Sequence, residues 1–411
     1  MACRLLRSFS AFVPLLGLTL LAGSAPAADG AEGPPITGKA VRRLQHLDSL
    51  MLDILRDQDV PGASLAIAVD GRLVFARGYG WADVENRKPV RPASRFNLAS
   101  CSKPITAAAV LKLVDQGKLR LDDKVFARLS NVRAPRGAKV DPRIHDITVR
   151  QLLHHAGGLV RDRGSAAQIA RRLRVELPVT LSQVVAFNLE KPLLFDPGTE
   201  AKYSNLGFLT LRLVAAHASG QDYETFTAEH VLKPMGIPAA HLDRMKGYRP
   251  REVHRYANGK HLEGGHGQLR GGDGSWVLST VDAMRFMTSL DGTRGERVLS
   301  KRAYQQMLAP LSSLGKKPNG RHNGLGWDVV ERSPSGVLYS KNGGVAGIAT
   351  WIEHLPSGVS WAVFFNGNLK GGDGGGDKRP RKPAGKNPWP LLRAAIEQVE
   401  KWPAHDLFDL E

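Results

Sequence analysis

The chain has 411 residues, of which 42% are hydrophobic and 23% are charged, and this ordinary globular composition excludes wholesale disorder. The 57 lysines and arginines outnumber the 39 aspartates and glutamates, and the formal net charge of +18 permits contact with anionic surfaces without indicating a fold. Aromatic residues make up only 7%, and no segment resembles a nucleic-acid-binding module, so specific nucleic-acid binding is not expected.

The first 27 residues have the pattern of a secretory signal peptide. Arg4 and Arg7 precede an apolar stretch over residues 11–22, which is too short to cross a membrane, and an A-P-A cleavage signal ends at Ala27. A retained signal anchor is the alternative interpretation. Cleavage leaves Cys101 as the single cysteine, which excludes an intramolecular disulfide. We therefore expect a periplasmic or secreted protein without a transmembrane anchor.

Both ends of the remaining chain combine a helix with strands. Residues 28–37 are predicted to be a flexible leader, and residues 38–402 to form the folded domain. Apolar residues recur every three or four positions over 41–55, which indicates an amphipathic helix. The strands predicted nearby are residues 63–69 and 73–79, joined at the turn Asp70-Gly71, and those near the other end are residues 348–354 and 359–366, followed by a helix over 391–399.

The middle of the chain is mostly helical. The helices predicted there cover residues 104–115, 148–155, 181–188, 206–218, 223–232 and 280–290. These patterns predict an α/β fold, in which an antiparallel sheet formed from both chain ends (38–103 and 291–402) is flanked by helices and a mostly helical part (104–290) is inserted. Residues 370–386 are basic and glycine-rich, which is typical of a flexible loop; their aspartates are out of register with a calcium-binding repeat.

The most informative motif is Ser100-x-x-Lys103. Residues three apart on a helical turn share a face, so the Lys103 ammonium is expected to reach the Ser100 hydroxyl. Pro104 is tolerated only in the first turn of a helix, which places the helix start close to Ser100. A serine beside a lysine and a helix N-terminus suits acyl transfer, because free N–H groups and the helix dipole favour developing negative charge. Alone, the motif also fits a serine that merely caps the helix.

Two further motifs carry polar groups that suit the same chemistry. Tyr203 and Asn205 lie two residues apart in a predicted extended stretch, so their side chains point the same way. A tyrosine whose pKa is lowered by nearby ammonium groups can act as a general base. Lys341 precedes a glycine-rich strand, where a substrate backbone can approach closely. Each motif also has a purely structural interpretation, namely a helix-entry turn capped by Asn205 and a hairpin with a solvent-facing lysine.

Together and in this order, the three motifs resemble those of the serine β-lactamase and penicillin-binding-protein-like hydrolases, on the branch nearest class C β-lactamases, D-alanyl-D-alanine carboxypeptidases and related esterases. The family's S-x-x-K matches Ser100–Lys103, its Y-x-N matches Tyr203–Asn205 and its K-x-G matches Lys341–Gly343. Further similar stretches lie at 147–159, 271–282 and 324–327, so the resemblance covers residues 41–367. It implies a β-lactamase/transpeptidase-like fold and no cofactor.

The resemblance implies that Ser100 attacks a substrate carbonyl to form an acyl-enzyme, while Lys103 and Tyr203 share the proton transfers. It also implies that Asn205 orients Lys103 or a substrate amide, and that Lys341 binds a substrate carboxylate and lowers the pKa of Tyr203. The implied substrate-binding groups are the backbone N–H groups of Ser100 and Gly344, which form an oxyanion hole, together with Asn342 and Gly343.

The sequence departs from the family pattern at Asn342, where antibiotic-hydrolysing members usually carry threonine or serine. That hydroxyl helps to hold the substrate carboxylate, so its loss disfavours β-lactam hydrolysis. The expected function is an exported serine hydrolase acting on an ester, a small amide or a D-amino-acid peptide, like an esterase or a D-alanyl-D-alanine carboxypeptidase, and β-lactamase activity stays open as a further alternative. The alternative is a catalytically silent relative that senses penicillin or cell-wall fragments.

The histidines of the sequence do not form a pattern that indicates a metal site. The adjacent His154 and His155 would point about 100° apart on a helix, which is poor geometry for sharing one metal ion, and the chain has no H-E-x-x-H motif. We therefore expect no metal site and a structural role for these histidines. The partners we expect are a small-molecule or peptide substrate and, given the basic charge, anionic polymers of the cell envelope.

Overall fold

The computed structural model describes residues 33–161, 163–243, 247–263, 275–314, 320–370 and 386–409. The predicted signal peptide, half of the predicted leader (28–32) and most of the predicted basic loop lie outside these residues. The end of the leader differs from the prediction, because Ile36 and Thr37 form strand β1 and pair with Tyr79 and Gly78. Backbone pairing therefore orders these two residues. In the described part of the chain, no helix has the length and apolar character needed to span a bilayer.

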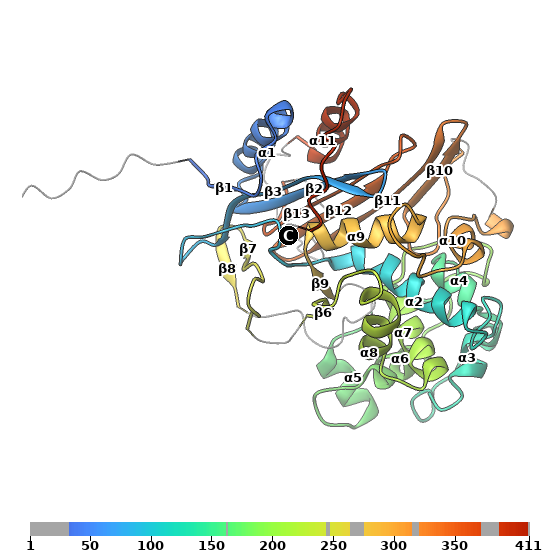
Figure 1. Cartoon of the computed structure of the whole chain (residues 1–411). Helices are drawn as coiled ribbons and strands as arrows, with labels where there is room; N and C mark the ends of the chain where they lie inside the picture. The colour runs from blue at the N-terminus through green and yellow to red at the C-terminus, as the bar shows by residue number, and fades with distance from the viewer. Residues whose placement is uncertain are drawn as a thin grey trace, which may run out of the picture. The chain divides into compact units, whose positions relative to one another are not determined.

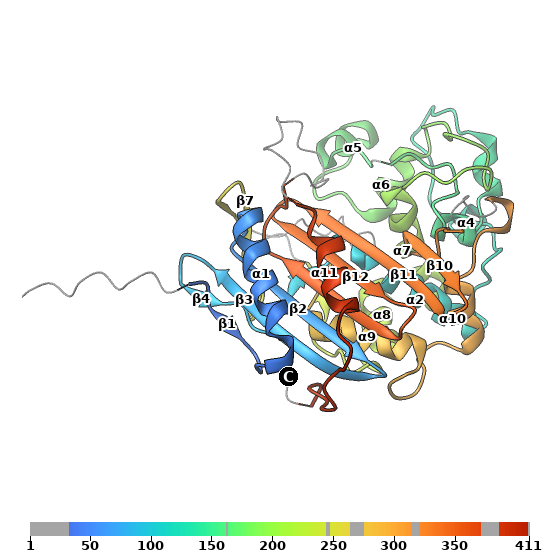
Figure 2. The same ribbon diagram turned by 90° about the horizontal axis from the view of Figure 1, so that it is seen from above.

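An antiparallel sheet built from both ends of the chain dominates the fold (Figures 1 and 2). Within the described residues it has eight strands, in the spatial order β1-β3-β2-β13-β12-β11-β10, and β4 pairs with β3. The strands are β1 (Ile36–Thr37), β2 (Gly62–Val69), β3 (Arg72–Asp83), β4 (Lys88–Pro89), β10 (Val329–Ser333), β11 (Gly336–Val345), β12 (Ile348–His354) and β13 (Val359–Phe365). The predicted α/β class with a sheet from both termini is confirmed.

The two chain ends meet where β2 pairs with β13 in the middle of the sheet. Ala63 lies opposite Phe365 and Val69 lies opposite Val359, and every residue of both strands is buried. The predicted turn between β2 and β3 is also present. Asp70 and Gly71 have φ angles of 49° and 76°, the left-handed conformations that a two-residue hairpin turn requires.

Helices cover both faces of the sheet. Helices α1 (Gln45–Gln58) and α11 (Pro388–Glu397) contact each other on one face (Figure 2), where Leu47 and Met51 share a core with Leu65. Helix α9 (Thr280–Asp291) packs against β2, β3 and β13 on the other face. Burying one large aliphatic side chain contributes about 1.5–3 kcal/mol to the free energy of unfolding, so the apolar contacts on the two faces of the sheet hold the helices against it. Helix α9 was predicted to belong to the helical part, whereas its packing places it with the sheet.

The helical part is organised around helix α2 (Lys103–Asp115), whose residues from Lys103 to Leu111 are all buried. Helix α2 contacts α7, α8 and α10. The remaining helices are α3 (Val125–Arg128), α4 (Val149–Leu153), α5 (Ala166–Leu173), α6 (Leu181–Asn188), α7 (Asn205–Ser219), α8 (Tyr223–Thr227), which runs on into a π-helical turn over Ala228–Leu232, and α10 (Lys301–Met307).

Short strands connect the helical part to the sheet. Strand β9 (Trp276–Leu278) pairs with both β5 (Phe96–Asn97) and β6 (His241–Leu242), and β7 (Arg255–Ala257) forms a hairpin with β8 (Lys260–Leu262). These strands were not predicted from the sequence, and neither were helices α3, α5 and α10. For α5 a signal was present, because Ser165 and Gln168 form a capping box at its start.

Candidate active site

Ser100 lies in a short 3-10 turn, Ala99–Ser102, which leads directly into helix α2. The residue before it, Ala99, has a φ of 47°, a left-handed conformation that is unfavourable for a residue with a Cβ. Its backbone N–H donates to the Asn97 Oδ1 atom at 2.7 Å, and the Asn97 amide donates to Asp243 at 2.7 Å. These bonds and the pairing of β5 with β9 hold the turn, so that the half-buried Ser100 has a fixed position.

Tyr203 and Asn205 lie about a hundred residues after Ser100 and Lys103 in the sequence, and the fold brings them into contact with this pair. The Ser100 Oγ atom is 2.5 Å from the Tyr203 hydroxyl oxygen and 3.3 Å from Lys103 Nζ. Lys103 Nζ also donates to Asn205 Oδ1 at 3.0 Å, and the Lys103 side chain is fully buried. Both predicted proton-transfer groups are therefore within hydrogen-bonding distance of the predicted nucleophile.

Tyr203 and Asn205 enter the site at the start of helix α7. The helix is capped by Ser204, whose side chain accepts from the backbone N–H of Gly207 at 3.1 Å. The structural interpretation in which Asn205 caps this helix is therefore wrong. Because Ser204 fulfils that role, the Asn205 amide is directed to Lys103.

The adjacent histidines lie behind this segment and after helix α4. The His155 ring packs against the Tyr203 ring with centroids 4.5 Å apart, and its Nδ1 atom accepts from the backbone N–H of Ser204 at 3.2 Å. Burial, reinforced by the nearby ammonium groups of Lys341 and Lys103, holds the pKa of His155 well below its usual value. His154 lies 3.1 Å through Nδ1 from the Asn323 carbonyl oxygen. Both contacts agree with the predicted structural role, and His155 supports the Tyr203 segment.

Lys341, in strand β11, reaches the site from the sheet. Its Nζ atom lies 5.0 Å from the centroid of the Tyr203 ring and forms an ion pair with Asp328. The Lys341 side chain is only 1% exposed, whereas that of Asp328 is 31% exposed. The predicted carboxylate-binding lysine thus already has a carboxylate partner from within the chain, which no sequence motif indicated.

The charges around Tyr203 favour its phenolate form. Burial alone would raise the pKa of Tyr203, but the ammonium groups of Lys103 and Lys341 outweigh this effect and the pKa is lowered. Burial likewise works against the charge of Lys341, yet Asp328 and Tyr203 keep the pKa of Lys341 above its usual value. Tyr203 therefore has the electrostatic environment of a general base.

Cys101 lies beside the nucleophile but lacks the environment of a reactive thiol. Its Sγ atom donates to the Lys341 carbonyl oxygen at 3.3 Å, and burial raises the pKa of Cys101 to about 12. A thiolate is needed for nucleophilic attack, so Cys101 is chemically inert next to Ser100.

Strand β11 passes so close to Ser100 that position 343 accepts only glycine. A Cβ atom on Gly343 would lie 2.9 Å from the Ser100 nitrogen and 2.5 Å from the Leu98 carbonyl oxygen. Strand β10 pairs with β11 only as far as Ser340. Among the described strands, none covers the outer edge of residues 341–345, and Asn342 is exposed there. This edge can accept an added substrate strand.

We expect the substitution Gly343→Ala to lower the free energy of unfolding by about 1–3 kcal/mol, because the added methyl group overpacks the backbone of the Ser100 turn. Denaturant unfolding measures this effect. The control is Gly207→Ala, where the nearest heavy atom to a Cβ is 3.6 Å away and no loss is expected. Equal stability of Gly343→Ala and wild type would contradict the close approach of the two segments.

An antiparallel sheet flanked by helices, with a serine, a lysine and a tyrosine meeting where the sheet adjoins the helical part, defines the class of β-lactamase-fold serine hydrolases. The model of the β-lactamase family matches residues 42–386, and the chain belongs to this family.

The chain is similar to one protein in part of its sequence and to solved structures in its fold. The protein flp of Staphylococcus aureus (strain MW2) is 28% identical over 191 residues, which make up 46% of this chain and 36% of flp. The chain therefore matches little more than a third of that relative. The octameric penicillin-binding protein homologue from Pyrococcus abyssi superimposes with a TM-score of 0.64 at 25% identity, covering 78% of this chain and 73% of that one. The D-amino acid amidase from Ochrobactrum anthropi SV3 superimposes with a TM-score of 0.65 at 21% identity, covering 87% and 100%.

Proposed function

We propose that this protein hydrolyses esters, small amides or D-amino-acid peptides through an acyl-enzyme formed on Ser100. The observation that carries the proposal is the position of the Ser100 hydroxyl, which lies within hydrogen-bonding distance of both the Tyr203 phenol and the Lys103 ammonium. A serine alone is a weak nucleophile, and an adjacent base of lowered pKa is what activates it.

In the proposed reaction, the Tyr203 phenolate accepts the proton of Ser100 as its Oγ atom attacks the substrate carbonyl, while the Lys103 ammonium donates a hydrogen bond that stabilises the charges of this pair. The carbon–heteroatom bond of the substrate then breaks, and the same proton passes to the leaving group. Water next attacks the acyl carbon and gives a proton to Tyr203. The bond between the acyl carbon and Oγ then breaks, the proton passes from Tyr203 to Oγ, and the acid product leaves. Asn205 holds the Lys103 ammonium in position through its 3.0 Å hydrogen bond.

The negative oxygen of the tetrahedral intermediate needs hydrogen-bond donors. We assign this role to the backbone N–H groups of Ser100 and Gly344, on two segments that the Gly343 contact brings together. Ser100 also precedes helix α2, whose N-terminus favours negative charge. Asn342 and Gly343 contribute the uncovered edge of β11, along which an extended substrate can lie.

The Lys341–Asp328 ion pair narrows the range of substrates in this proposal. An ammonium that is already neutralised and buried gives little attraction to a substrate carboxylate. Asn342 also lacks the hydroxyl that antibiotic-hydrolysing family members offer. Both features favour substrates without a carboxylate beside the scissile bond, such as neutral esters and amides, over β-lactams.

Mass spectrometry of the intact protein tests the function directly. The protein is incubated with a fluorophosphonate, and its turnover is measured with p-nitrophenyl esters, D-alanyl peptides and the cephalosporin nitrocefin. We expect a single covalent adduct and faster turnover of neutral esters than of nitrocefin. A stable adduct without turnover of any substrate would instead favour the silent sensor of cell-wall fragments. No adduct would end the proposal.

The pH dependence of activity gives a prediction about Tyr203. If its phenolate is the base, the acid limb of kcat/KM reports the lowered pKa of Tyr203. We expect Lys341→Met to move this limb to higher pH, because the lost ammonium and the unpaired Asp328 carboxylate both disfavour the phenolate. The control Lys202→Met removes a lysine whose side chain is 56% exposed, where solvent screens the charge. A limb that does not move would contradict the assignment.

Asp328 gives a prediction about substrate charge. We expect Asp328→Asn to raise kcat/KM for the hydrogen succinate ester of p-nitrophenol about tenfold relative to the acetate ester, a change of ~1.4 kcal/mol. The succinate ester carries a carboxylate and the acetate ester does not, so their ratio reports the freed Lys341 ammonium. Glu331→Gln, on the neighbouring strand β10, is the control and should leave the ratio unchanged. An unchanged ratio in Asp328→Asn would contradict the role of this ion pair.

We also propose that the protein is exported to the periplasm or beyond and that its basic surface contacts anionic cell-envelope polymers. The signal-peptide pattern that ends at Ala27 and the formal charge of +18 support this proposal. Amino-terminal sequencing of the protein recovered from cell fractions tests it, with residue 28 expected as the first residue. A full-length protein in the cytoplasmic fraction would contradict it.

A further inference from the structure

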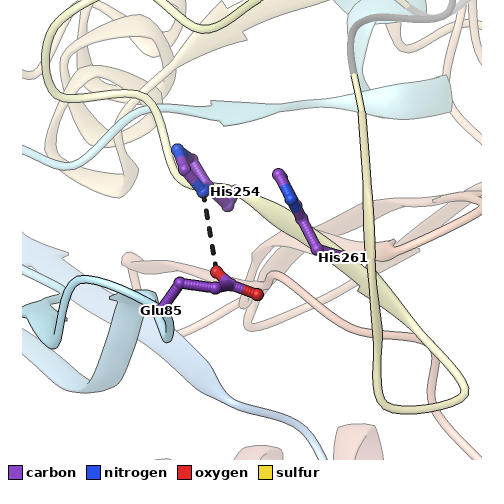
Figure 3. Close-up of side chains that lie close together, drawn as sticks. All are labelled: Glu85, His254 and His261. Atoms are coloured by element: carbon purple, nitrogen blue, oxygen red, sulfur yellow. Dashed lines mark ion pairs between the residues drawn. The ribbon is translucent and has the colours of Figure 1, made fainter.

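Two histidines and a glutamate gather at the far end of strand β3, where no motif was recognised in the sequence (Figure 3). Glu85 lies in the turn between β3 and β4, His254 directly precedes β7, and His261 lies in β8. One ligand atom from each of the three side chains lies within 4.8 Å of the other two. The three residues are up to 176 positions apart in the sequence, so only the fold brings them together.

Backbone and side-chain hydrogen bonds fix the two segments that carry this cluster. The backbone N–H of His254 donates to the Ala82 carbonyl oxygen at 2.7 Å. The Tyr256 hydroxyl donates to Glu85 Oε2 at 2.5 Å and accepts from the backbone N–H of Val84 at 2.8 Å. The β7–β8 hairpin is therefore attached to the end of β3 around the cluster, and its position does not depend on the three side chains alone.

The cluster contains nitrogen atoms whose hydrogen-bonding capacity is not used. His254 Nδ1 and His261 Nε2 are both buried, and neither makes a hydrogen bond to any residue that the structure describes. Carboxylate oxygens of Asp83 and Glu85 lie 3.5 and 4.0 Å from His254 Nδ1. Buried polar atoms normally make hydrogen bonds, so two imidazole nitrogens that make none and lie beside carboxylates are suited to bind an electrophilic ion.

We propose that Glu85, His254 and His261 bind a divalent transition-metal ion such as Zn²⁺. Two imidazoles and one carboxylate form a ligand set that suits Zn²⁺. Ca²⁺ and Mg²⁺ prefer sites made only of oxygen ligands, so the two imidazoles disfavour these ions. Because the ligand atoms of the three side chains lie within 4.8 Å of one another, a single ion can contact all three. A water molecule or the Asp83 carboxylate, 3.5 Å from His254 Nδ1, completes four-coordination.

Binding of an ion requires the three side chains to move closer together and the two rings to turn. Ligand atoms around tetrahedral Zn²⁺ lie about 3.4 Å apart, closer than the 4.8 Å limit within which these atoms lie. The rings of His254 and His261 are stacked, with centroids 4.7 Å apart and an angle of 13° between their planes. The lone pairs of two parallel rings point in parallel directions, whereas ligands of one ion must point their lone pairs at it. Each ring therefore has to turn about its Cβ–Cγ bond when the ion binds. Glu85 is exposed, so its carboxylate can shift toward the ion although Oε2 also accepts from the Tyr256 hydroxyl.

An ion at this site would stabilise the local structure and would take no part in the acyl transfer. The hairpin that carries His254 and His261 packs against Gly347, where a Cβ atom would lie 2.9 Å from the backbone nitrogen of Tyr256. Gly347 joins β12 to β11, the strand that carries Lys341. A bound ion would therefore tie the β3–β4 turn to a hairpin that borders the sheet near the proposed substrate edge.

Isothermal titration calorimetry of the full chain, after treatment with a chelator, tests the proposal with Zn²⁺ as the probe. We expect one ion per chain, and at least a tenfold weaker affinity in each of His254→Ala, His261→Ala and Glu85→Gln. Titration with Co²⁺ should give visible absorption bands in the wild type and lose them in the histidine variants. The control His145→Ala removes an exposed histidine outside the cluster and should bind as the wild type does.

Two further measurements keep the test decisive. Circular dichroism shows whether each variant is folded, and His261→Asn replaces His261→Ala if the latter is not. Zn²⁺ should also raise the melting temperature of the wild type but not of the cluster variants, since a ligand of the folded state stabilises it. Ser100→Ala should bind Zn²⁺ normally, so the outcome is independent of the proposed hydrolysis. Substoichiometric binding, or equal affinity in the folded histidine variants, would overturn the site.

Discussion

Ser100→Ala is expected to abolish covalent labelling by a fluorophosphonate and to lower kcat at least about 10⁴-fold, because alanine has no atom that can form the acyl-enzyme. The remaining activity would come from substrate binding and the oxyanion hole alone. Intact-mass spectra and turnover of p-nitrophenyl acetate measure both effects.

The fold should not change in this variant. Ser100 is half-buried, and its turn is held by backbone pairing and by Asn97, none of which involves the hydroxyl. Ser333→Ala, at the exposed end of strand β10, is the matched control and should label and turn over as the wild type does. An adduct of equal yield on Ser100→Ala would show that another residue is the nucleophile.

Lys103→Met is the second variant with a large expected effect, a fall in kcat of about 10²–10⁴-fold. Methionine matches the length of the buried lysine stem but neither accepts a proton nor donates to Ser100 or Asn205. The hydroxyl would lose one of its two activating partners, and Tyr203 would lose an ammonium that lowers its pKa. Single-turnover kinetics with p-nitrophenyl acetate separates slow acylation from slow deacylation.

Stability should change much less than activity. Lys103 is completely buried, so Lys103→Met removes the cost of burying a charge, but it also leaves the Asn205 Oδ1 atom without its donor, and these two effects oppose each other. Lys118→Met, at an exposed position just beyond the end of helix α2, controls for the loss of a surface charge. A variant that loses both activity and stability would indicate that Lys103 is mainly a structural residue.

Local patterns predicted much of the fold. The period of apolar residues located helix α1 and the strand pairs β2–β3 and β12–β13, because each is specified by neighbours in the chain. The spacing of Ser100 and Lys103 likewise predicted their contact, since three residues on a helical turn fix that geometry. The approach of Tyr203 and Lys341 to this pair was inferred from family resemblance, and the structure brings both beside Ser100 or its partners.

Features that depend on tertiary contacts were not predictable in this way. Asp328 carries no motif, and its ion pair with Lys341 arises because the start of β10 lies beside β11. The left-handed backbone of Ala99 opposes that residue's own preference and is imposed by its surroundings. The cluster of Glu85, His254 and His261 is assembled from three separate segments, so neither spacing nor composition revealed it.

The pairing of β2 with β13 has a consequence for how the polypeptide acquires its shape during translation. Val69 in β2 can pair only after Val359 in β13, a residue 290 positions later, has been synthesised. Ribosomes add about 5–20 residues per second, so this interval lasts on the order of 15–60 s. Throughout that time the hairpin of β2 and β3 presents an unpaired apolar edge, which makes the nascent chain a natural client of holding chaperones.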